Sequence, residues 1–457
     1  MSEKKYTKNL SQRQSKNVKI LAAGKHQTTQ SGIIAMCKYL ERIGFKQLFN
    51  KELKKPNNPN SKYSYCEVFM LTILSIAAGA ESMEGIVYIG QDSVLRKILS
   101  WIYIPCATTL SRIYKRFKIQ DIYNLESLNH SLRNLIWKKY IRRKGSLYNQ
   151  EERTYIDIDS TVITVYGKQE GVSKGYNPKQ KGKYSYHPLI AFFANTKEIL
   201  QATLRTGACY TSNGIIGFCQ QLFASLPNDK FIIRADSGFF SGDFLSFLEK
   251  KQQGYLIKVK INKKLKQLLY QSKWQFVPNM PGWQQCIFEY SCDKWKHRRK
   301  FIAVREIIQE ESFGASIINY TFGKYNYFCY VTNEYYTPWM AHKAYGKRAT
   351  CETFIDEAKN QCALAKIRTN NFLANSALFQ AAVIAYNSFR WMALDSNNKK
   401  LKTWEIKTIR LFIIRVSARL ISKARQLILL IPKNFLHMFV FKDWFRIGGG
   451  NNFSFVS

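Results

Sequence analysis

Acidic residues are scarce in this sequence of 457 residues, which has 31 Asp and Glu against 70 Lys and Arg. The resulting formal net charge of +39 argues against an ordinary enzyme of small metabolites, because such self-repulsion is costly without a polyanionic partner. Nucleic acid is the natural partner, since each Lys or Arg placed on a phosphate releases counterions. A generally lysine-rich proteome is the alternative origin of this charge.

Three further features are missing. The ten cysteines form no CxxC pair, so we expect neither a zinc site nor a disulfide framework. The N-terminal segment is polar and basic and lacks the apolar stretch of a secretory signal. The apolar runs near residues 68–80 and 427–441 are too short or too interrupted to span a membrane. We therefore expect a cytoplasmic protein without a membrane partner.

Composition and periodicity divide the chain into five regions. Residues 1–150 read as a basic arm (1–30) and a helical DNA end-binding domain. Residues 151–261 give the order β-β-β-α-β-α-β, which predicts an α/β fold with an RNase H-like core, a mixed five-stranded sheet with flanking helices. Residues 262–340 read as a mostly β insertion, 341–400 as the rest of the core, and 401–457 as a basic helical C-terminal region.

Four carboxylates stand at informative places in these elements. Asp157 and Asp159 share one face of a predicted strand, because side chains alternate with period two. Asp236 ends another predicted strand and precedes Ser-Gly, which permits a sharp turn. Glu352 lies on a helix expected to begin near residue 338. Each acid alone is more often a turn former, a cap or an ion-pair partner, but together they suit two divalent metal ions acting on phosphodiesters.

The expected acidic helix also carries an ordered polar stripe. Tyr345, Arg348, Glu352 and Lys359 follow the spacing Y-x2-R-x3-E-x6-K. At about 100° per residue these four side chains fall within roughly 60° of one another on a helix. An ion pair between Arg348 and Glu352 is the plain structural explanation of part of this stripe.

Taken together, these motifs resemble a known family. The stretches DIDSTV, QEG, GYNP, SYHPLI, LRTG and RADSGFF, followed by the Y-R-E-K stripe, resemble the transposases of IS1380-type insertion sequences, in the IS4-like group of DDE transposases. The resemblance runs from about residue 30 to beyond residue 430. It implies a catalytic and metal-binding triad of Asp159, Asp236 and Glu352. The metal implied is Mg²⁺, for which Mn²⁺ can substitute, with two ions when DNA is bound.

The resemblance also implies DNA contacts. Tyr345, Arg348 and Lys359 would contact phosphates beside the cut, and Trp295 would stack on a flipped base, with Trp283 as its rival. Asp157 remains an alternative first acid and Asp356 an alternative third acid.

The expected function is cut-and-paste transposition of an insertion sequence, by metal-dependent hydrolysis at the transposon ends and strand transfer into target DNA. The partners would be double-stranded DNA at the inverted-repeat ends and at the target, bound by a dimer, with no small-molecule substrate. Two alternatives stay open: a catalytically silent end-binding protein derived from a transposase, and an RNase H-like nuclease without strand transfer.

Overall fold

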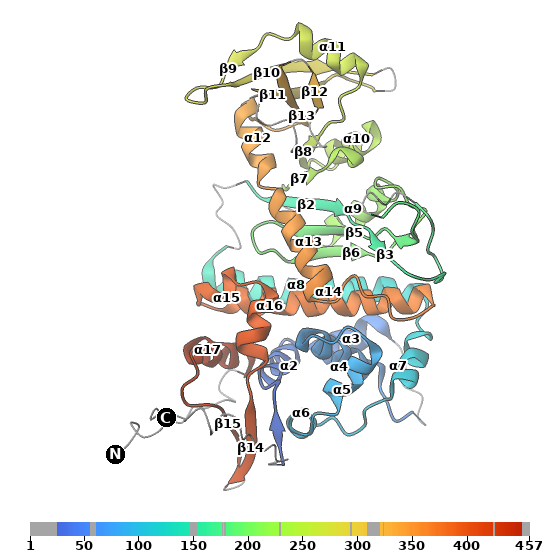
Figure 1. Cartoon of the computed structure of the whole chain (residues 1–457), viewed down its shortest axis with the longest axis vertical. Coiled ribbons are helices and arrows are strands. Elements are labelled where there is room, and N and C mark those ends of the chain that lie inside the picture. The colour runs from blue at the N-terminus through green and yellow to red at the C-terminus, as the bar shows by residue number, and fades with distance from the viewer. Residues whose placement is uncertain are drawn as a thin grey trace, which may run out of the picture.

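The computed structural model describes residues 25–54, 61–146, 153–175, 177, 180–227, 230–292, 295–308, 320–322, 324–423 and 426–449. Most of the expected basic arm, residues 1–24, lies outside the described residues. The molecule is elongated and layered along its long axis (Figure 1). A helical body lies at one end, two long helices in contact cross the middle, and a large sheet extends to the other end. The two long helices are α8 (Ile119–Lys144) and α14 (Phe372–Asp395).

The sheet has the strand order β6-β5-β2-β7-β8-β13-β11-β10-β9. These strands are β2 (Tyr155–Ser160), β5 (Leu189–Phe193), β6 (Ile199–Thr203), β7 (Ile232–Ala235), β8 (Gly254–Lys258), β9 (Gln275–Phe276), β10 (Trp283–Tyr290), β11 (Arg299–Ile307) and β13 (Tyr325–Thr332). The β2/β7 and β7/β8 pairs are parallel, and the other pairs on this path are antiparallel. The mixed sheet with flanking helices that the sequence predicts is therefore confirmed, but within the described residues it has ten strands instead of the expected five.

The region at 262–340 is not separate from this sheet. Strand β13 pairs with β8 through Tyr330, Val331 and Thr332, so the expected insertion continues the same sheet. It also contains a helix, α11 (Lys263–Gln271), and a short strand, β12 (Tyr320–Phe322), that pairs with β13. The remaining short pair, β3 (Ile163–Thr164) with β4 (Ser185–Tyr186), stands apart from the large sheet.

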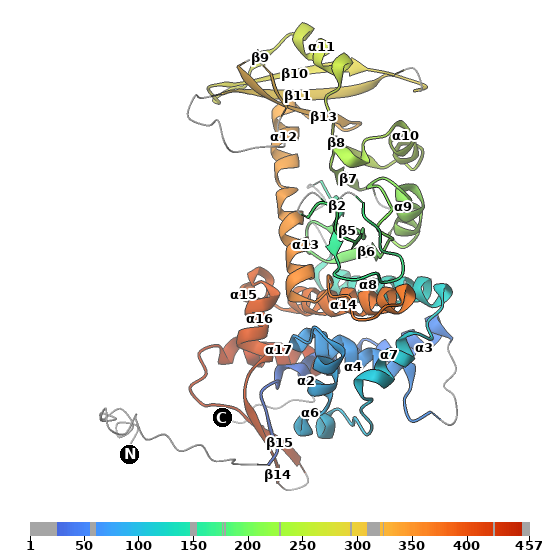
Figure 2. The same ribbon diagram turned by 45° about the vertical axis from the view of Figure 1, so that its right-hand side comes forward.

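Helices cover both faces of the central strands. Figure 2 shows α9 (Ile215–Ala224) and α10 (Gly242–Lys250) on one side, and α12 (Pro338–Gly346) with α13 (Ala349–Gln361) on the other. Ile156 and Ile158 of β2 belong to the hydrophobic cluster that includes α9 and α10. Because side chains alternate along a strand, Asp157 and Asp159 face α12 and α13.

The free edge of β6 is covered by polar side chains of the two long helices. Asn387 accepts a hydrogen bond from the Ile199 N–H at 2.8 Å and donates to the Ile199 carbonyl at 2.8 Å. Asn129 donates to the same carbonyl at 3.4 Å, and Gln380 donates to the Ala202 carbonyl at 2.7 Å. These bonds satisfy backbone groups that a buried edge strand would otherwise leave unpaired. They join the sheet to the helical layer.

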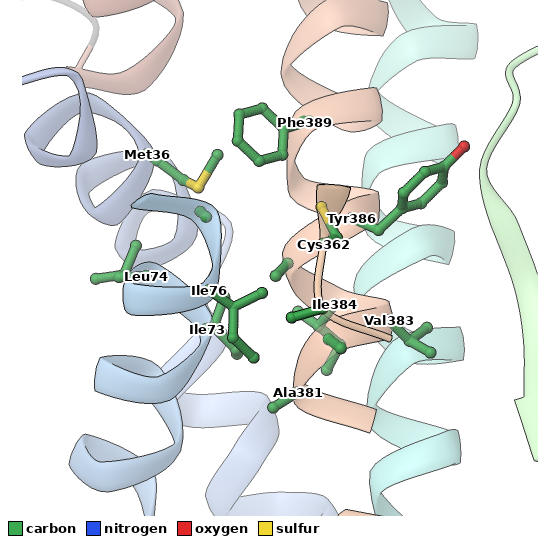
Figure 3. Packing of buried hydrophobic residues seen from close by; sticks show 14 of the residues in the cluster. Met36, Ile73, Leu74, Ile76, Cys362, Ala381, Val383, Ile384, Tyr386 and Phe389 are labelled. Atoms are coloured by element: carbon green, nitrogen blue, oxygen red, sulfur yellow. The ribbon is translucent and has the colours of Figure 1, made fainter. Parts of the chain in front are cut away.

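The helical body combines both ends of the chain. It contains α2 (Gly32–Arg42), α3 (Phe45–Leu53), α4 (Tyr65–Ala78), α5 (Met83–Gly90), α6 (Ser93–Ile98), α7 (Ala107–Tyr114), α15 (Lys399–Thr403), α16 (Ile406–Ile409), the π-helical turn η4 (Arg410–Ile414) and α17 (Met438–Gly449). Figure 3 shows Met36, Ile73 and Ile76 from the N-terminal helices facing Ile384 and Phe389 of α14. The same hydrophobic core includes Ile413 and Trp444, so the regions expected at 1–150 and 401–457 pack together.

The prediction of an all-helical C-terminal region is wrong for residues 418–430. This segment forms a hairpin of β14 (Ala418–Lys423) and β15 (Gln426–Leu430), and β14 also pairs with β1 (Gln27–Thr28). Buried and exposed residues alternate along β14, as in a strand with one covered face. Short apolar segments of this kind fit a helical and a strand period almost equally well.

None of the described helices is by itself long and apolar enough to cross a membrane. Helices α4 and α5 reach that length and composition only as a pair, which is bent by 96°.

Candidate active site

The parallel register of β2 and β7 brings the first two acids together. Ile158 is the partner of Ala235, so Asp159 and Asp236, each one residue further along, lie beside each other at the carboxyl ends of their strands. Asp236 is the N-cap of a short 3₁₀ turn, η2 (Ser237–Phe239), and accepts a hydrogen bond from the Gly238 N–H at 2.9 Å. Both side chains are partly exposed.

Asp157 and Asp159 have different environments although they share a face. Asp157 is fully buried, and its two oxygens accept hydrogen bonds from Arg234 Nε and Nη2, both at 2.7 Å. Arg234 also donates to the Ala344 carbonyl at 2.6 Å and lies 4.3 Å from the ring centroid of Tyr155. Asp157 is therefore committed to an ion pair that ties β2 and β7 to α12. This arrangement favours Asp159 as the first acid.

The sequence predicts one helix that carries the whole polar stripe, but the structure has two helices there. Helix α12 ends at Gly346, and Arg348 is the N-cap of α13. Tyr345 therefore lies on α12, whereas Glu352 and Lys359 lie on α13. Glycine is a poor helix former, which is consistent with a break at this place.

Arg348 and Lys359 both hold the end of β2. Arg348 Nη2 lies 3.2 Å from Asp159 Oδ2 and donates to the Ile158 carbonyl at 3.2 Å. Lys359 Nζ donates to Thr161 Oγ1 at 3.0 Å and to the Val162 carbonyl at 2.9 Å. Arg348 is buried. The two cations expected at DNA phosphates thus position the segment that carries Asp159.

The third acid, Glu352, lies exposed in the first turn of α13. Its charge acts on Asp159: burial raises the pKa of the Asp159 carboxyl to about 6, Arg348 opposes the rise, and Asp236 and Glu352 add to it. The rival acid Asp356 is exposed and accepts a hydrogen bond from Asn360 at 2.5 Å. Asp159, Asp236 and Glu352 thus form one electrostatic group.

Asp159, Asp236 and Glu352 are the candidate ligands for a metal ion at this site. Carboxylate oxygens are the ligands that Mg²⁺ prefers, so the three acids fit the ion in type. Among the residues that the structure describes, however, no group of three or more His, Cys, Asp or Glu side chains lies close enough to hold a metal ion. Asp159 is instead paired with Arg348. Metal binding by all three acids would therefore require rearrangement of this pair.

Tyr345 is part of an aromatic network rather than an isolated side chain. Its ring centroid lies 4.8 Å from that of Tyr330, and burial raises the pKa of the Tyr345 hydroxyl above its usual range. The Tyr330 hydroxyl is hydrogen-bonded to His342 Nδ1 at 2.9 Å. The His342 ring lies 5.1 Å from Trp283, between centroids. Trp283 therefore reaches the acidic site through a chain of contacts on the α12 side.

Trp295, the tryptophan first expected to stack on a base, packs elsewhere. Its ring centroid lies 5.9 Å from Phe240 and 5.8 Å from Tyr290, and the Arg299 guanidinium lies 4.7 Å from it. A Cβ on Gly242 would come within 2.4 Å of Trp295 Nε1, which shows how closely the indole approaches α10. This packing favours a structural role for Trp295.

Two arginines at the site were missed by the sequence reasoning. Arg234 could have been found, because it lies opposite Asp157 in the parallel pair and two residues before Asp236. Arg205, in the LRTG motif, donates to Ser160 Oγ at 3.2 Å, the His187 carbonyl at 2.8 Å and the Asn213 carbonyl at 2.6 Å. It fastens two loops beside Asp159. Its local sequence offers no signal for these distant partners.

Comparison with known proteins identifies the class. The family profile described as "Transposase DDE domain group 1" matches residues 10–447, and the chain belongs to this family. No curated protein matches the sequence. Among solved structures, the chain is similar to "Cryo-EM structure of piggyBac transposase synaptic complex with hairpin DNA (SNHP)", with 14% identity and a TM-score of 0.43 over 85% of this chain and 81% of that chain.

Proposed function

We propose that this protein catalyses cut-and-paste transposition of an IS1380-type insertion sequence, with Asp159, Asp236 and Glu352 as its catalytic acids. The observation that carries the proposal is the β2/β7 register, which sets Asp159 beside Asp236 under the helix that bears Glu352. The strand order β6-β5-β2-β7-β8, with β7 and β8 parallel to β2, supports an RNase H-like core.

The three acids would hold Mg²⁺, which when bound activates water or a 3′-hydroxyl and stabilises the leaving oxygen. Arg348 holds Asp159 in place without the metal, and by turning from that carboxylate its guanidinium would become available to a phosphate. Lys359 keeps the end of β2 fixed through Thr161 and the Val162 carbonyl. Tyr345 would donate its hydroxyl proton in a hydrogen bond to a neighbouring phosphate, since burial keeps it protonated.

The DNA partner follows from charge as well as from family. A net charge of +39 supports binding of double-stranded DNA at both transposon ends and at the target. Two ends have to be held together for transposition, so we expect a dimer on DNA. Such a protein would work in the cytoplasm, at the bacterial nucleoid.

One observation favours the catalytically silent alternative. The described residues contain no ready-made cluster of three metal ligands, and Arg348 is paired with Asp159. A protein that binds ends without cutting them would keep this pair permanently. Cleavage therefore has to be tested directly.

The test is cleavage of duplex DNA made from the genomic sequence that flanks both ends of the coding sequence. The purified full chain is incubated with this DNA and Mg²⁺, and Asp236→Asn is compared with Asp356→Asn. Asp356 is a matched control because it is an exposed acid on α13, one turn from Glu352. We expect Asp236→Asn to lose cleavage by at least about 100-fold while binding DNA, and Asp356→Asn to cleave normally.

Three other outcomes would each revise the account. Binding without cleavage by the wild type would support the silent alternative. Cleavage that survives Asp236→Asn would remove Asp236 from the active site. Loss of cleavage in Asp356→Asn alone would make Asp356 the third acid.

A further inference from the structure

A basic residue lies in the same row of the sheet as the first two acids. The register pairs Ala235 with Ile257, so Lys258, the last residue of β8, lies beside Asp236 as Asp236 lies beside Asp159. On its other side Lys258 is the partner of Tyr330 in β13. Neighbouring strands are about 4.8 Å apart, so the row Asp159–Asp236–Lys258–Tyr330 is continuous across four strands.

The members of this row point to the same side of the sheet. Their neighbours Ala235, Ile257 and Val331 all belong to the cluster on the α9 and α10 side. By alternation Asp236 and Lys258 face α12 and α13. Burial lowers the pKa of the Lys258 ammonium, while Asp236 and Glu352 oppose that shift, so both carboxylates act on it. Lys258 thus lies among the candidate catalytic acids.

Lys258 differs from the other cations around these acids in its hydrogen bonding. Arg348, Lys359 and Arg205 all donate to the segment that carries Asp159. In the part of the chain that the structure describes, the Lys258 ammonium makes no hydrogen bond or ion pair. Its side chain is half-buried at the carboxyl end of β8. Its charge is therefore available to an anion that enters over the acids.

We propose that Lys258 is a further charged group of the catalytic centre and that its ammonium binds a DNA phosphate beside the cut. This inference rests on the proposed function. Without DNA, the same ammonium offsets the mutual repulsion of Asp236 and Glu352. With DNA, it compensates the charge of a phosphate that the acids alone would repel.

The first part of the test is single-turnover cleavage of the flanking DNA by Lys258→Met, with Lys260→Met as the matched control. Methionine keeps the apolar stem of lysine, and Lys260 is an exposed cation two residues further along. We expect Lys258→Met to be about 100-fold slower, as for loss of one transition-state donor, and Lys260→Met to match the wild type. Lys258→Arg should recover part of the rate, because it keeps the charge.

The second part separates a phosphate contact from a structural role. Once the wild type has mapped the cut, single neutral methylphosphonates replace the phosphates on either side of it. On the duplex that lacks the contacted phosphate, the loss caused by Lys258→Met should shrink from about 100-fold to about 2-fold, because the interaction is already gone. A melting temperature for each variant monitors folding, and Lys258→Gln, which also removes the charge, replaces Lys258→Met in the series if the latter does not fold.

Two results would overturn the assignment while leaving the proposed function intact. One is a Lys258→Met protein that cleaves as fast as the wild type. The other is an equal loss of rate on every methylphosphonate duplex, which would mean that Lys258 acts through the fold. A wild type that does not cleave at all would instead overturn the proposed function, and this assignment with it.

Discussion

At the scale of single residues, the site separates two acids that strand alternation alone leaves equivalent. Period-two alternation correctly places Asp157 and Asp159 on one face, but it cannot say which is free for chemistry. The difference comes from Arg234 on the neighbouring strand, which binds both oxygens of Asp157. A buried charge that has found its partner is unavailable to a metal, whereas Asp159 keeps 15% of its side chain exposed.

Replacing Asp157 should therefore damage the fold. Asp157→Asn leaves the buried Arg234 guanidinium without its counter-ion, which should cost about 3–5 kcal/mol of unfolding free energy. Urea denaturation monitored by circular dichroism measures this loss. The control Asp356→Asn, at an exposed site, should change stability by no more than about 0.5 kcal/mol. An Asp157→Asn protein that is as stable as the wild type but cannot cleave DNA would make Asp157 the first acid.

At the scale of elements, local sequence patterns predict helices and strands correctly only where long-range contacts do not change them. The order β-β-β-α-β-α-β expected over residues 151–261 is found as β2, β5, β6, α9, β7, α10 and β8, with the short β3/β4 pair as an addition between β2 and β5. The break at Gly346 was missed because the polar spacing from Tyr345 to Lys359 fits one unbroken helix. The sequence predicts a helix where β14 and β15 form a hairpin. The pairing of β14 with β1, far away in sequence, has no local signal.

A buried glutamate between α8 and β6 should make the stability of the fold depend on pH. Glu126 is 5% exposed and accepts a hydrogen bond from Thr203 at 2.8 Å; burial raises its pKa from 4.5 to about 7. The folded state therefore keeps a proton that the unfolded state releases at lower pH. Its stabilising effect is complete below about pH 4.5 and is lost as the pH rises to about 7, by about 3 kcal/mol in all.

Glu126→Gln removes this titration. Denaturation curves between pH 4.5 and pH 7.5 should show a smaller fall in stability for the variant than for the wild type. Identical pH dependence in the two proteins would mean that Glu126 ionises normally in the folded state.

At the scale of the whole molecule, the large sheet is joined to the helical body. The two long helices satisfy the edge of β6 with side chains, and α14 also packs against the N-terminal helices. The sequence predicts a helical domain within residues 1–150. It could not predict that both ends of the chain share one core, because apolar periodicity identifies a buried face but not its partner.

The central claim is that Asp236 holds a catalytic metal ion. The most direct measurement is cleavage of the flanking DNA by Asp236→Cys in Mg²⁺ and in Mn²⁺. A thiolate is a poor ligand for Mg²⁺ and a better one for Mn²⁺. The account predicts that Asp236→Cys is inactive in Mg²⁺ and regains cleavage in Mn²⁺, whereas Asp236→Ala stays inactive in both. Equal activity of Asp236→Cys and the wild type in Mg²⁺ would contradict it.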